Sequence, residues 1–403
     1  MSTSLAYHTQ GIVGFQHKAY DFSGGSVIQR LVRNEWRCPC CRCGGVHLYK
    51  LRTRQIQGAP CGTRKIFFEV DIHRIYCPHC GKYSIENLPF LSHPMARITK
   101  ALERTLVELR HKMSITDISD YYEVPWRTIQ KCEKEHLKKK YRRIRLKDVR
   151  HIGIDEICVG RNHGKPRFLT IVRDLDSGAV LFVGDGKNGE SLMDFLKKIH
   201  YSKAKIELVA MDMGKAYIKW VKDYLPNANI VFDHFHVIKL MNEKVDKIRR
   251  NVLEKLDNEQ KALLKNQRFT LLRNYEDLKP EAQEHLVNIQ ATFKELGEAY
   301  MMKEALRSIY KTAQDGSQAE TALMTWCETA RLLDSKPLKT MANTIQTHLD
   351  GILGYWIFGV SSAAMEGFNN KIRHLISQAY GYHDEEYFKL KIFDLPNIRI
   401  KEI

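Results

Sequence analysis

Apolar residues are spaced differently in three parts of the chain, and each spacing predicts a different kind of structure. Between residues 96 and 137 they recur every three or four positions, which is typical of helices with one buried face. Between residues 151 and 233 short apolar runs alternate with helical stretches. From about residue 237 to 357 the pattern is helical throughout, with abundant Lys, Glu, Leu and Gln. We therefore predict helices, then a mixed α/β region, then an all-helical block.

The α/β region is predicted to begin with three strands and to continue with alternating helices and strands. The strands are predicted at 151–156, 168–172, 180–183, 206–212 and 229–233, and the helices at about 190–199 and 214–224. Three consecutive strands followed by alternating helix and strand is the order of an RNase H-like sheet. The helical block is too long for a loop, so we interpret it as an inserted domain. The predicted fold class is multidomain α/β, with an RNase H-like mixed α/β core that a large all-α insertion interrupts.

The helices between residues 96 and 137 have the spacing of a helix-turn-helix. Three are predicted, with a short helix over 115–122 and a turn at 123–125 before the last one begins. Ile118 and Ile129 would face the interior and Val124 would lie in the turn, which leaves polar positions of the last helix for phosphates and base edges. Those positions are Arg127, Thr128, Gln130, Lys131 and Lys134. An ordinary helical hairpin has the same periodicity, so the motif alone leaves both interpretations open.

The distribution of charge favours a DNA-binding front end. The net charge is +17; residues 1–150 hold 28 Lys and Arg against 13 Asp and Glu, whereas residues 151–403 hold 36 against 34. A cationic module joined to a near-neutral body indicates a polyanionic partner, with nucleic acid first, although a merely basic surface is the simpler alternative. The basic run at 138–147 would follow a phosphate backbone. No apolar run reaches eighteen residues and no signal peptide is recognisable, so we expect a soluble, cytoplasmic protein associated with the nucleoid.

Seven of the ten cysteines lie between Cys38 and Cys80. The segments CPCCRC, beginning at Cys38, and CPHC, beginning at Cys77, each contain a C-x2-C pair, and two such pairs make a four-thiolate zinc site. The stretch 64–72 between them is strand-like, as in a zinc ribbon. Cys40 and Cys43 have the required spacing too, but the proline after Cys38 matches the one after Cys77. The expected ligands of a structural Zn2+ are therefore Cys38, Cys41, Cys77 and Cys80; buried free thiols are the alternative.

Two aspartates at strand ends are candidates for chemistry on phosphodiesters. Asp155 and Asp212 each end an apolar strand, and the carboxyl edge of an α/β sheet is where sites form. Two divalent ions about 4 Å apart, held by oxygen ligands, can activate an attacking oxygen and stabilise a leaving one. An aspartate after a strand is more often a cap or turn residue, so the position alone is a weak signal. Asp233 is a competitor, because it also ends a strand and precedes two histidines in the segment DHFH.

A third carboxylate, Glu366, is predicted on a helix near the end of the chain. In the segment 361–373, Glu366, Asn370 and Arg373 would share one helix face. The opposite face would be apolar, with Met365, Phe368, Ile372 and Leu375. The polar face would then point into a site while the apolar face packs on the sheet.

Taken together, these motifs resemble the ISL3 family of insertion-sequence transposases, over nearly the whole chain from about Cys38 to Phe393. The resemblance is carried by the order zinc ribbon, helix-turn-helix, GIDE strand, AMD strand, FDHFHVIK and MEGFNNKIR. It departs from the family at Ile376-Ser377-Gln378, where a basic pair is common, and at His383, where an arginine is usual. These differences concern DNA contacts near the C-terminus and leave the acidic residues intact.

The resemblance implies a DDE transposase with catalytic residues Asp155, Asp212 and Glu366, which would hold two Mg2+ or Mn2+ ions. Its partners would be double-stranded DNA, both terminal inverted repeats and target, which it would cleave and join by strand transfer. Lys371 and Arg373 are candidates for holding a phosphate. Pairing two DNA ends implies a homodimer or larger assembly. The alternative is a DNA-binding regulator that has lost catalysis, and the three intact acids argue against it.

These expectations divide the chain into six segments. They are an N-terminal arm (1–32), expected to be loosely ordered, a zinc-ribbon domain (33–92), a helix-turn-helix domain with its basic linker (93–147), the first part of the RNase H-like core (148–238), the helical insertion (239–357) and the C-terminal core helix with the third carboxylate (358–403).

Overall fold

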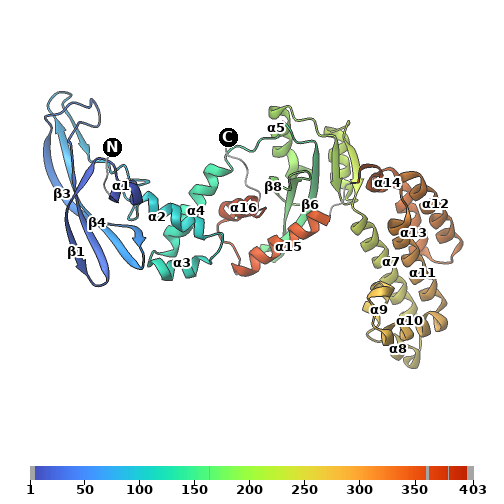
Figure 1. The fold of residues 1–403 in the computed structure, drawn as a ribbon. Helices are drawn as coiled ribbons and strands as arrows, with labels where there is room; N and C mark the ends of the chain where they lie inside the picture. Colours follow the sequence, from blue (N-terminus) through green and yellow to red (C-terminus); the bar gives the residue numbers. More distant parts are fainter. Residues whose placement is uncertain (1–4, 163, 360–362, 380, 397–403) are drawn as a thin grey trace. The chain divides into compact units, whose positions relative to one another are not determined.

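The protein is described by a computed structural model in which residues 5–162, 164–359, 363–379 and 381–396 are placed. The chain forms two compact units, residues 1–142 and 143–403 (Figure 1). Each unit contains one five-stranded mixed sheet and several helices. The predicted α/β fold class is therefore correct.

The first unit is built on a sheet with strand order β1-β2-β4-β3, and a fifth strand, β5, pairs with β4. The strands are β1 (Phe15–Ser23), β2 (Ser26–Arg33), β3 (His47–Cys61), β4 (Arg64–Cys77) and β5 (Lys82–Ile85), and a short helix, α1 (Leu5–Gln10), precedes them. Only β2 and β4 run parallel; the other pairs are antiparallel. The predicted strand at 64–72 lies within β4.

Residues 15–33 correct our expectation of a loosely ordered N-terminal arm, because they form β1 and β2 of this sheet. Phe15 and Leu31 are buried in a core that also contains Ile56 and Phe68. Most other side chains of β1 are exposed, so this strand lacks the alternation of apolar and polar residues that identifies a half-buried strand. Its place in the sheet is secured by backbone pairing with β2, which the side-chain pattern does not reveal.

Three helices follow the sheet, as predicted: α2 (Lys100–Leu109), α3 (Ile115–Tyr122) and α4 (Trp126–Lys140). Ile118, Val124 and Ile129 are all buried in one small core, as the helix-turn-helix spacing requires. The Ser114 side chain caps α3 in a capping box with Asp117. The periodic apolar residues and the capping box of α3 are local features that favour helices in this strongly basic segment.

Two further contacts hold this helical group together and fix it to the sheet. Arg110 Nε donates to the buried Glu133 carboxylate at 2.9 Å, which joins α2 to α4. Gln57 of β3 bonds through its backbone to Arg97 and Thr99, and its side-chain amide donates to the Tyr122 carbonyl at 2.8 Å. The sheet and the three helices therefore form one unit.

The second unit contains a sheet with strand order β10-β9-β6-β7-β8. Its strands are β6 (His151–Asn162), β7 (Lys165–Asp174), β8 (Val180–Asp185), β9 (Leu208–Met211) and β10 (Asn229–Phe232). β6, β7 and β8 form an antiparallel meander, whereas β9 and β10 run parallel to β6. All five predicted strands are present, in the predicted order.

Both faces of this sheet are covered. On one face, a short 3-10 turn, η1 (Gly189–Leu192), and the helices α5 (Met193–Ser202) and α6 (Lys215–Tyr224) share a core with Ile152, Ile154 and Val209 of the strands. On the other, α15 (Ala363–Gln378) and α16 (Glu385–Asp394) pack through Phe368 and Phe388 against a core that includes Ile157 and Ile171. Residues on opposite faces of a strand alternate, so neighbouring positions of β6 serve different cores.

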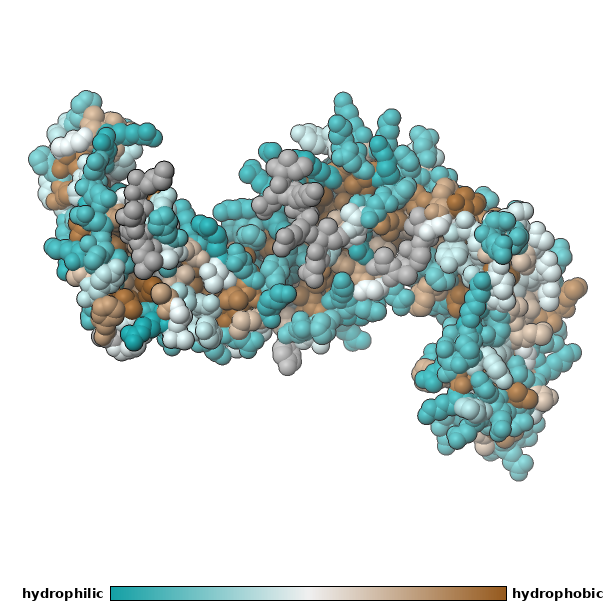
Figure 2. All heavy atoms as spheres, viewed as in Figure 1, coloured by the Kyte–Doolittle hydropathy of each residue, from teal (hydrophilic) through white to brown (hydrophobic). Residues whose placement is uncertain are grey.

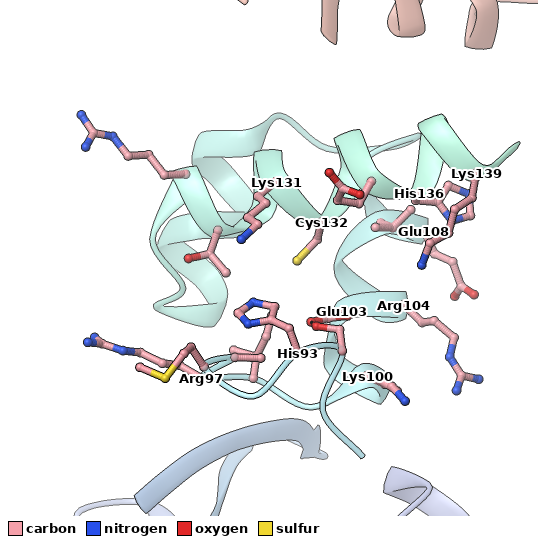
Figure 3. A pocket seen from close by; sticks show the side chains of 18 of the residues that line it. His93, Arg97, Lys100, Glu103, Arg104, Glu108, Lys131, Cys132, His136 and Lys139 are labelled. Atoms are coloured by element: carbon pink, nitrogen blue, oxygen red, sulfur yellow. Dashed lines mark hydrogen bonds between the residues drawn. The ribbon is translucent and has the colours of Figure 1, made fainter. Parts of the chain in front are cut away.

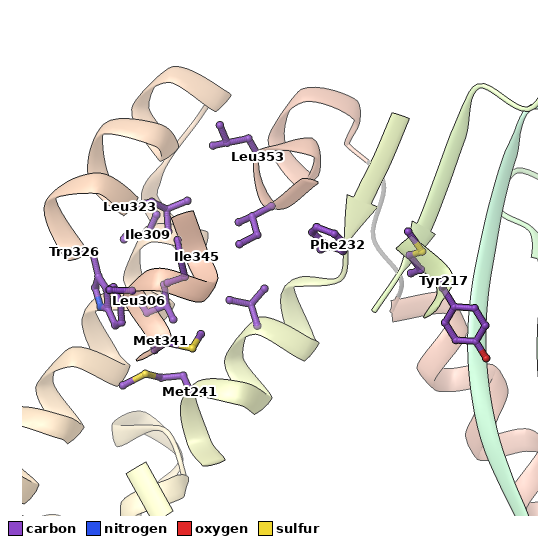
Figure 4. Close-up of a cluster of buried hydrophobic side chains, with 14 of the residues drawn as sticks. Tyr217, Phe232, Met241, Leu306, Ile309, Leu323, Trp326, Met341, Ile345 and Leu353 are labelled. Atoms are coloured by element: carbon purple, nitrogen blue, oxygen red, sulfur yellow. The ribbon is translucent and has the colours of Figure 1, made fainter. Parts of the chain in front are cut away.

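The predicted helical block is present between β10 and α15. Its helices are α7 (His234–Lys255), α8 (Asn258–Leu264), α9 (Arg268–Leu272), α10 (Pro280–Thr292), α11 (Lys294–Thr312), α12 (Gly316–Leu332), α13 (Lys336–Thr347) and α14 (Leu349–Phe358), with a 3-10 turn, η2 (Tyr275–Asp277). Figure 4 shows Met241, Leu306, Trp326 and Met341 converging from α7, α11, α12 and α13. This core is continuous with that of the sheet.

The visible face of the molecule in Figure 2 carries mainly hydrophilic side chains, with hydrophobic ones scattered among them. A membrane-crossing helix needs roughly twenty apolar residues. The helices of the described residues include none that meets this requirement.

Candidate active site

Asp155, Asp212 and Asp233 lie at the same level of three neighbouring parallel strands. The strand register pairs Gly153 with Ala210, and Met211 with Phe232. Continuing this register by one or two residues aligns Asp155 with Asp212 and Asp212 with Asp233. Asp212 and Asp233 directly follow β9 and β10, but Asp155 lies within β6, which continues to Asn162 as a hairpin with β7. The prediction that Asp155 ends its strand is therefore wrong. All three aspartates nevertheless lie at the carboxyl end of the parallel part of the sheet, where sites form in α/β proteins.

Asp155 lies in an environment that disfavours its negative charge. Burial is the largest influence and raises the pKa of Asp155, and the nearby Asp212 carboxylate raises it further. The Glu156 backbone N–H donates to Asp155 Oδ1 at 2.7 Å and partly opposes this effect. Two carboxylates that repel each other in a half-buried position offer the hard oxygen donors that divalent cations prefer. Asp155 and Asp212 therefore offer the type of oxygen ligand that a divalent metal requires.

Asp212 is held in one orientation by the turn that follows it. Its Oδ1 accepts a hydrogen bond from the Gly214 backbone N–H at 2.9 Å. A Cβ on Gly214 would lie 2.7 Å from that oxygen, so a larger residue would displace the carboxylate. Gly214 also precedes the first residue of α6, and the helix start therefore fixes the position of this acid.

Asn369 on α15 bonds directly to Asp155. Its Nδ2 donates to Asp155 Oδ2 at 2.6 Å, and the residue is only 5% exposed. Its other amide atom, Oδ1, is buried without a hydrogen-bond partner in the described structure. Met365 of α15 lies against Gly153 of β6, where a Cβ would be 2.9 Å from the Met365 sulfur. Nothing in the sequence singles out Asn369 beyond its place in the MEGFNNKIR segment.

Glu366 is on the same helix but its carboxylate is exposed. It precedes Asn369 by three residues, so the two side chains leave adjacent parts of the helix surface. The described residues show no contact of Glu366 with Asp155 or Asp212. The structure therefore brings two of the three predicted catalytic acids together and the helix of the third beside them, but it does not bring the three carboxylates together.

The predicted faces of this helix are otherwise as expected. Met365, Phe368 and Ile372 are buried against the sheet, and Leu375 is half-buried. Lys371 and Arg373 are exposed, and Arg373 Nη1 donates to Asn370 Oδ1 at 2.6 Å.

Asp233 and His236 form a pair next to the two aspartates. Asp233 Oδ1 accepts from the Phe235 N–H at the start of α7, and its Oδ2 lies 3.1 Å from His236 Nδ1. The bond to Asp233 raises the pKa of His236 most, and Asp155 and Asp212 raise it further. His236 therefore faces the acidic edge. Sequence reasoning did not select it, although an aspartate that caps a helix three residues before a histidine is a recognisable signal.

Glu156 belongs to the opposite face of β6 from Asp155. It pairs with Thr170, whose hydroxyl bonds to Ser191 and Tyr217. Burial raises the pKa of Glu156, and Asp212 raises it further, while Lys187 and Lys239 lower it. Glu156 thus adds a further carboxylate near Asp155 and Asp212, from the other face of the sheet.

The four predicted zinc ligands lie together at one end of the first unit's sheet. The sulfur atoms of Cys38 and Cys80 are 3.7 Å apart, and those of Cys41 and Cys77 are 3.5 Å apart. Zn–S bonds of about 2.3 Å in a tetrahedron require sulfurs about 3.8 Å apart, so these cysteines fit a zinc ion. Backbone N–H groups of Cys41 and Cys40 help lower the pKa of Cys38 to about 6. Cys40 is exposed, whereas Cys43 approaches Cys41 and His79 instead.

The predicted DNA-binding positions of α4 all lie in its first three turns. Arg127 and Lys131 are exposed, and Thr128, Gln130 and Lys134 are half-buried. Pro125 precedes the helix, so Arg127 and Thr128 belong to its first turn.

Comparison with known proteins gives similarities over most of the chain. A family model for transposases of the DDE type and ISL3 group matches residues 152–392. The transposase for insertion sequence element IS1001 of Bordetella parapertussis is 28% identical over 355 residues, which cover 87% of this chain and 86% of that protein. The transposase for element IS1557 of Mycobacterium tuberculosis H37Rv is 27% identical over 393 residues, with coverage of 90% and 87%. A solved Drosophila P element transposase strand transfer complex has a TM-score of 0.41 at 13% identity, over 74% of this chain and 92% of that one. The matched family range runs from β6 into α16 and so includes the acidic edge and the helical block.

Proposed function

The chain belongs to the ISL3 family of transposases, and from that premise we propose that it binds the terminal inverted repeats of a bacterial insertion sequence and catalyses DNA end cleavage and strand transfer by a two-metal DDE mechanism. Transposition takes place on chromosomal DNA, so the proposed location is the cytoplasm at the nucleoid. The strand order of the second unit, a meander followed by two strands parallel to its first, supports an RNase H-like core.

One observation carries the proposal of catalysis. Asp155 and Asp212 lie level on neighbouring parallel strands, and Asn369 joins Asp155 to the helix that carries Glu366. If these aspartates only ended their strands or formed turns, a hydrogen bond from the distant helix α15 to one of them would not be expected.

The three acids have distinct surroundings, which indicate how they would act. Asp155, oriented by Asn369, and Asp212, oriented by Gly214, would hold two Mg2+ or Mn2+ ions with Glu366 as a further ligand. Such ions activate an attacking oxygen and stabilise a leaving oxygen at a phosphodiester. Exposed Lys371 and Arg373 on α15 would hold the phosphate of the DNA.

The proposed reaction has two displacements at phosphorus. First, water attacks the phosphodiester at each end of the element, and the bond to the 3′ oxygen breaks to leave a 3′-OH. That hydroxyl then attacks a phosphodiester of the target DNA in line, forms a new P–O bond and displaces the target's own 3′ oxygen. Neither step needs a covalent bond between DNA and protein.

The first unit would recognise the DNA. Cys38, Cys41, Cys77 and Cys80 would hold a structural Zn2+, and the polar face of α4 would contact the inverted repeat. Since two DNA ends must be joined in one event, we expect a homodimer or larger assembly on the DNA.

The test is cleavage of DNA that carries the ends of the insertion sequence, with Mg2+ or with EDTA. We expect nicking at the repeat boundary with Mg2+ for the wild type, and none for Asp155→Ala or Asp212→Asn. Retained binding to the repeats would show that the variants are folded. Specific binding without cleavage by zinc-loaded, oligomeric wild-type protein would instead identify a DNA-binding regulator without catalytic activity.

A further inference from the structure

A groove of about 1110 Å3 lies in the first unit between α4 on one side and the loop 92–99 with α2 on the other (Figure 3). Lys131 and Cys132 extend from α4 toward His93 and Glu103 of the opposite wall. We call the side formed by residues 92–111 the α2 wall and the side formed by residues 127–139 the α4 wall. The α4 wall includes three residues predicted to bind DNA: Arg127, Thr128 and Lys131.

Both walls are basic, and most of their cations are unneutralised. The Lys and Arg side chains are Arg97, Lys100 and Arg104 on the α2 wall and Arg127, Lys131 and Lys139 on the α4 wall. The groove also contains three glutamates, of which Glu103 is bonded to Ser92 and Glu135 lies 3.9 Å from Lys138. Within the described part of the chain, none of these six cations pairs with a carboxylate. Lys100 donates to the Pro89 backbone carbonyl at 2.7 Å.

A cluster of arginines next to the loop of the α2 wall gives a second sign of an anionic ligand. Arg54 of β3 donates to the carbonyls of Pro94 and Ala96 and so fixes the loop that leads into the α2 wall. Burial and the neighbouring guanidinium groups of Arg52 and Arg97 lower the pKa of Arg54. The positive charges of Arg52, Arg54 and Arg97 repel one another, which disfavours the folded state, and a bound anion would reduce this repulsion.

We propose that the groove holds the sugar–phosphate backbone of one DNA strand, with Arg97 and Arg104 of the α2 wall contacting phosphates opposite the predicted contacts of α4. The proposal rests on DNA binding by this unit, as proposed above, and extends it to a second set of residues. Cations on both walls of a groove match a backbone that is charged along its whole length. Phosphate contacts position a protein without reading sequence, so these arginines strengthen binding to any duplex.

The test measures how binding depends on salt. Each phosphate contact contributes about 0.9 to the slope of log affinity against log salt concentration, which is about a 3.5-fold loss of affinity between 50 and 200 mM salt. For the full-length, zinc-loaded protein we expect the double variant Arg97→Gln/Arg104→Gln to lower the slope by about 2. The effect should be equal for a duplex with the inverted repeat and for a scrambled duplex, measured by fluorescence anisotropy.

The matched control is Lys18→Gln/Arg64→Gln, which removes the same charge at exposed positions outside the groove. Its slope should stay close to that of the wild type. A second variant, Arg97→Lys/Arg104→Lys, keeps the charge and should retain most of the slope, whereas loss of binding by both groove variants would indicate a structural role and overturn the proposal.

The outcomes separate this proposal from the function it rests on. If the wild type binds neither duplex, DNA binding by this unit is refuted. If the wild type binds but the groove variant has the slope of the control, only the groove is refuted. If the double variant loses affinity only for the inverted-repeat duplex and not for the scrambled one, these arginines contact bases rather than phosphates, and the proposal is overturned. Competition by polyglutamate as effective as that by DNA of equal charge would identify an acidic protein as the partner instead.

Discussion

Replacing Asn369 by aspartate tests the link between α15 and the acidic edge with the smallest change of shape. In the wild type, Asn369 Nδ2 donates a hydrogen bond of 2.6 Å to the Asp155 carboxylate, and Asn369 is only 5% exposed. Asn369→Asp keeps the size of the side chain but exchanges this donor for an oxygen. When both carboxyls are ionised, the hydrogen bond is lost and two negative charges face each other where the pKa of Asp155 is already raised.

The size of the effect is bounded on both sides. Loss of a hydrogen bond to a charged group costs about 1.5–3 kcal/mol. Protonation sets the upper bound of this free-energy cost. If one of the two carboxyls binds a proton, it can donate a hydrogen bond to the other, so the cost cannot exceed that of keeping the proton bound. Since one pKa unit is 1.36 kcal/mol and an ordinary aspartate has a pKa near 3.9, keeping one proton bound costs about 4 kcal/mol at pH 7 and about 1.5 kcal/mol at pH 5. The variant should therefore weaken the docking of α15 by about 2–4 kcal/mol at pH 7.

The sign of the pH dependence follows from the same argument. The shared carboxyls have a folded-state pKa above the unfolded value, so the destabilisation appears above about pH 4 and grows as the pH rises. Acidification from pH 7 to pH 5 should therefore restore much of the protection of α15.

Hydrogen exchange of α15 amides measures this docking locally, and cleavage of insertion-sequence ends measures its effect on activity. The matched control for hydrogen exchange is Asn370→Asp, the same chemical change at the next, exposed residue. Asn370 bonds to Arg373, a proposed phosphate contact, so this control does not serve the cleavage assay. We expect Asn369→Asp to lose protection relative to this control and at least about tenfold in cleavage rate relative to the wild type. If both variants exchange alike and Asn369→Asp cleaves like the wild type, α15 is not held by Asp155 and the reasoning is wrong.

Three further predictions concern the zinc site, the helical block and His236. Cys77→Ser should release the bound zinc and expose β4 and β5 to proteolysis, whereas Cys61→Ser, at an exposed cysteine, should leave one zinc per chain by metal analysis. Gly351→Ala should lower the stability of the second unit by about 1–3 kcal/mol in urea because the added Cβ meets the Phe232 ring, while Gly367→Ala, on an open helix surface, should not destabilise it. The hydrogen bond to Asp233 is the main cause of the raised pKa of His236. The stabilisation by the protonated His236 should therefore be complete below the ordinary histidine pKa near 6.5 and should be lost as the pH rises through the pKa of His236 in the folded protein. His236→Asn should therefore destabilise the protein more at pH 6 than at pH 8.5, and an equal effect at both would contradict this assignment.

Local patterns were sufficient to predict most elements of the fold. The strand end at Asp212, the helix-turn-helix core around Ile118 and Ile129, and the spacing of the cysteines all follow from residues close together in the sequence. The two predicted acids meet because β6 and β9 are neighbouring parallel strands in register, although β6 continues past Asp155 to Asn162. The proximity of the two acids therefore follows from the strand order of the sheet.

The remaining features depend on contacts that no local pattern contains. The bond between Asn369 and Asp155 joins residues 214 positions apart, and many other polar residues of that helix were equal candidates in the sequence. The groove of the first unit combines Arg97 of the α2 wall with cations of the α4 wall, whose proximity depends on the packing of three helices. β1 was missed because its mostly exposed side chains carry no alternation, and backbone pairing with β2 together with the single buried Phe15 determines its place.

The position of α15 also depends on the helical block, because the block begins and ends at the acidic edge. α7 starts immediately after Asp233, and α14 returns to pack on β10, where Gly351 and Gly354 let the helix approach Phe232 and Val231 closely. A single continuous core joins the block to the sheet. Strain within the block would therefore shift the strand end at Asp233 as well as the point from which the chain continues toward Glu366. Both ends of this block of more than a hundred residues are therefore fixed to the same strand, β10.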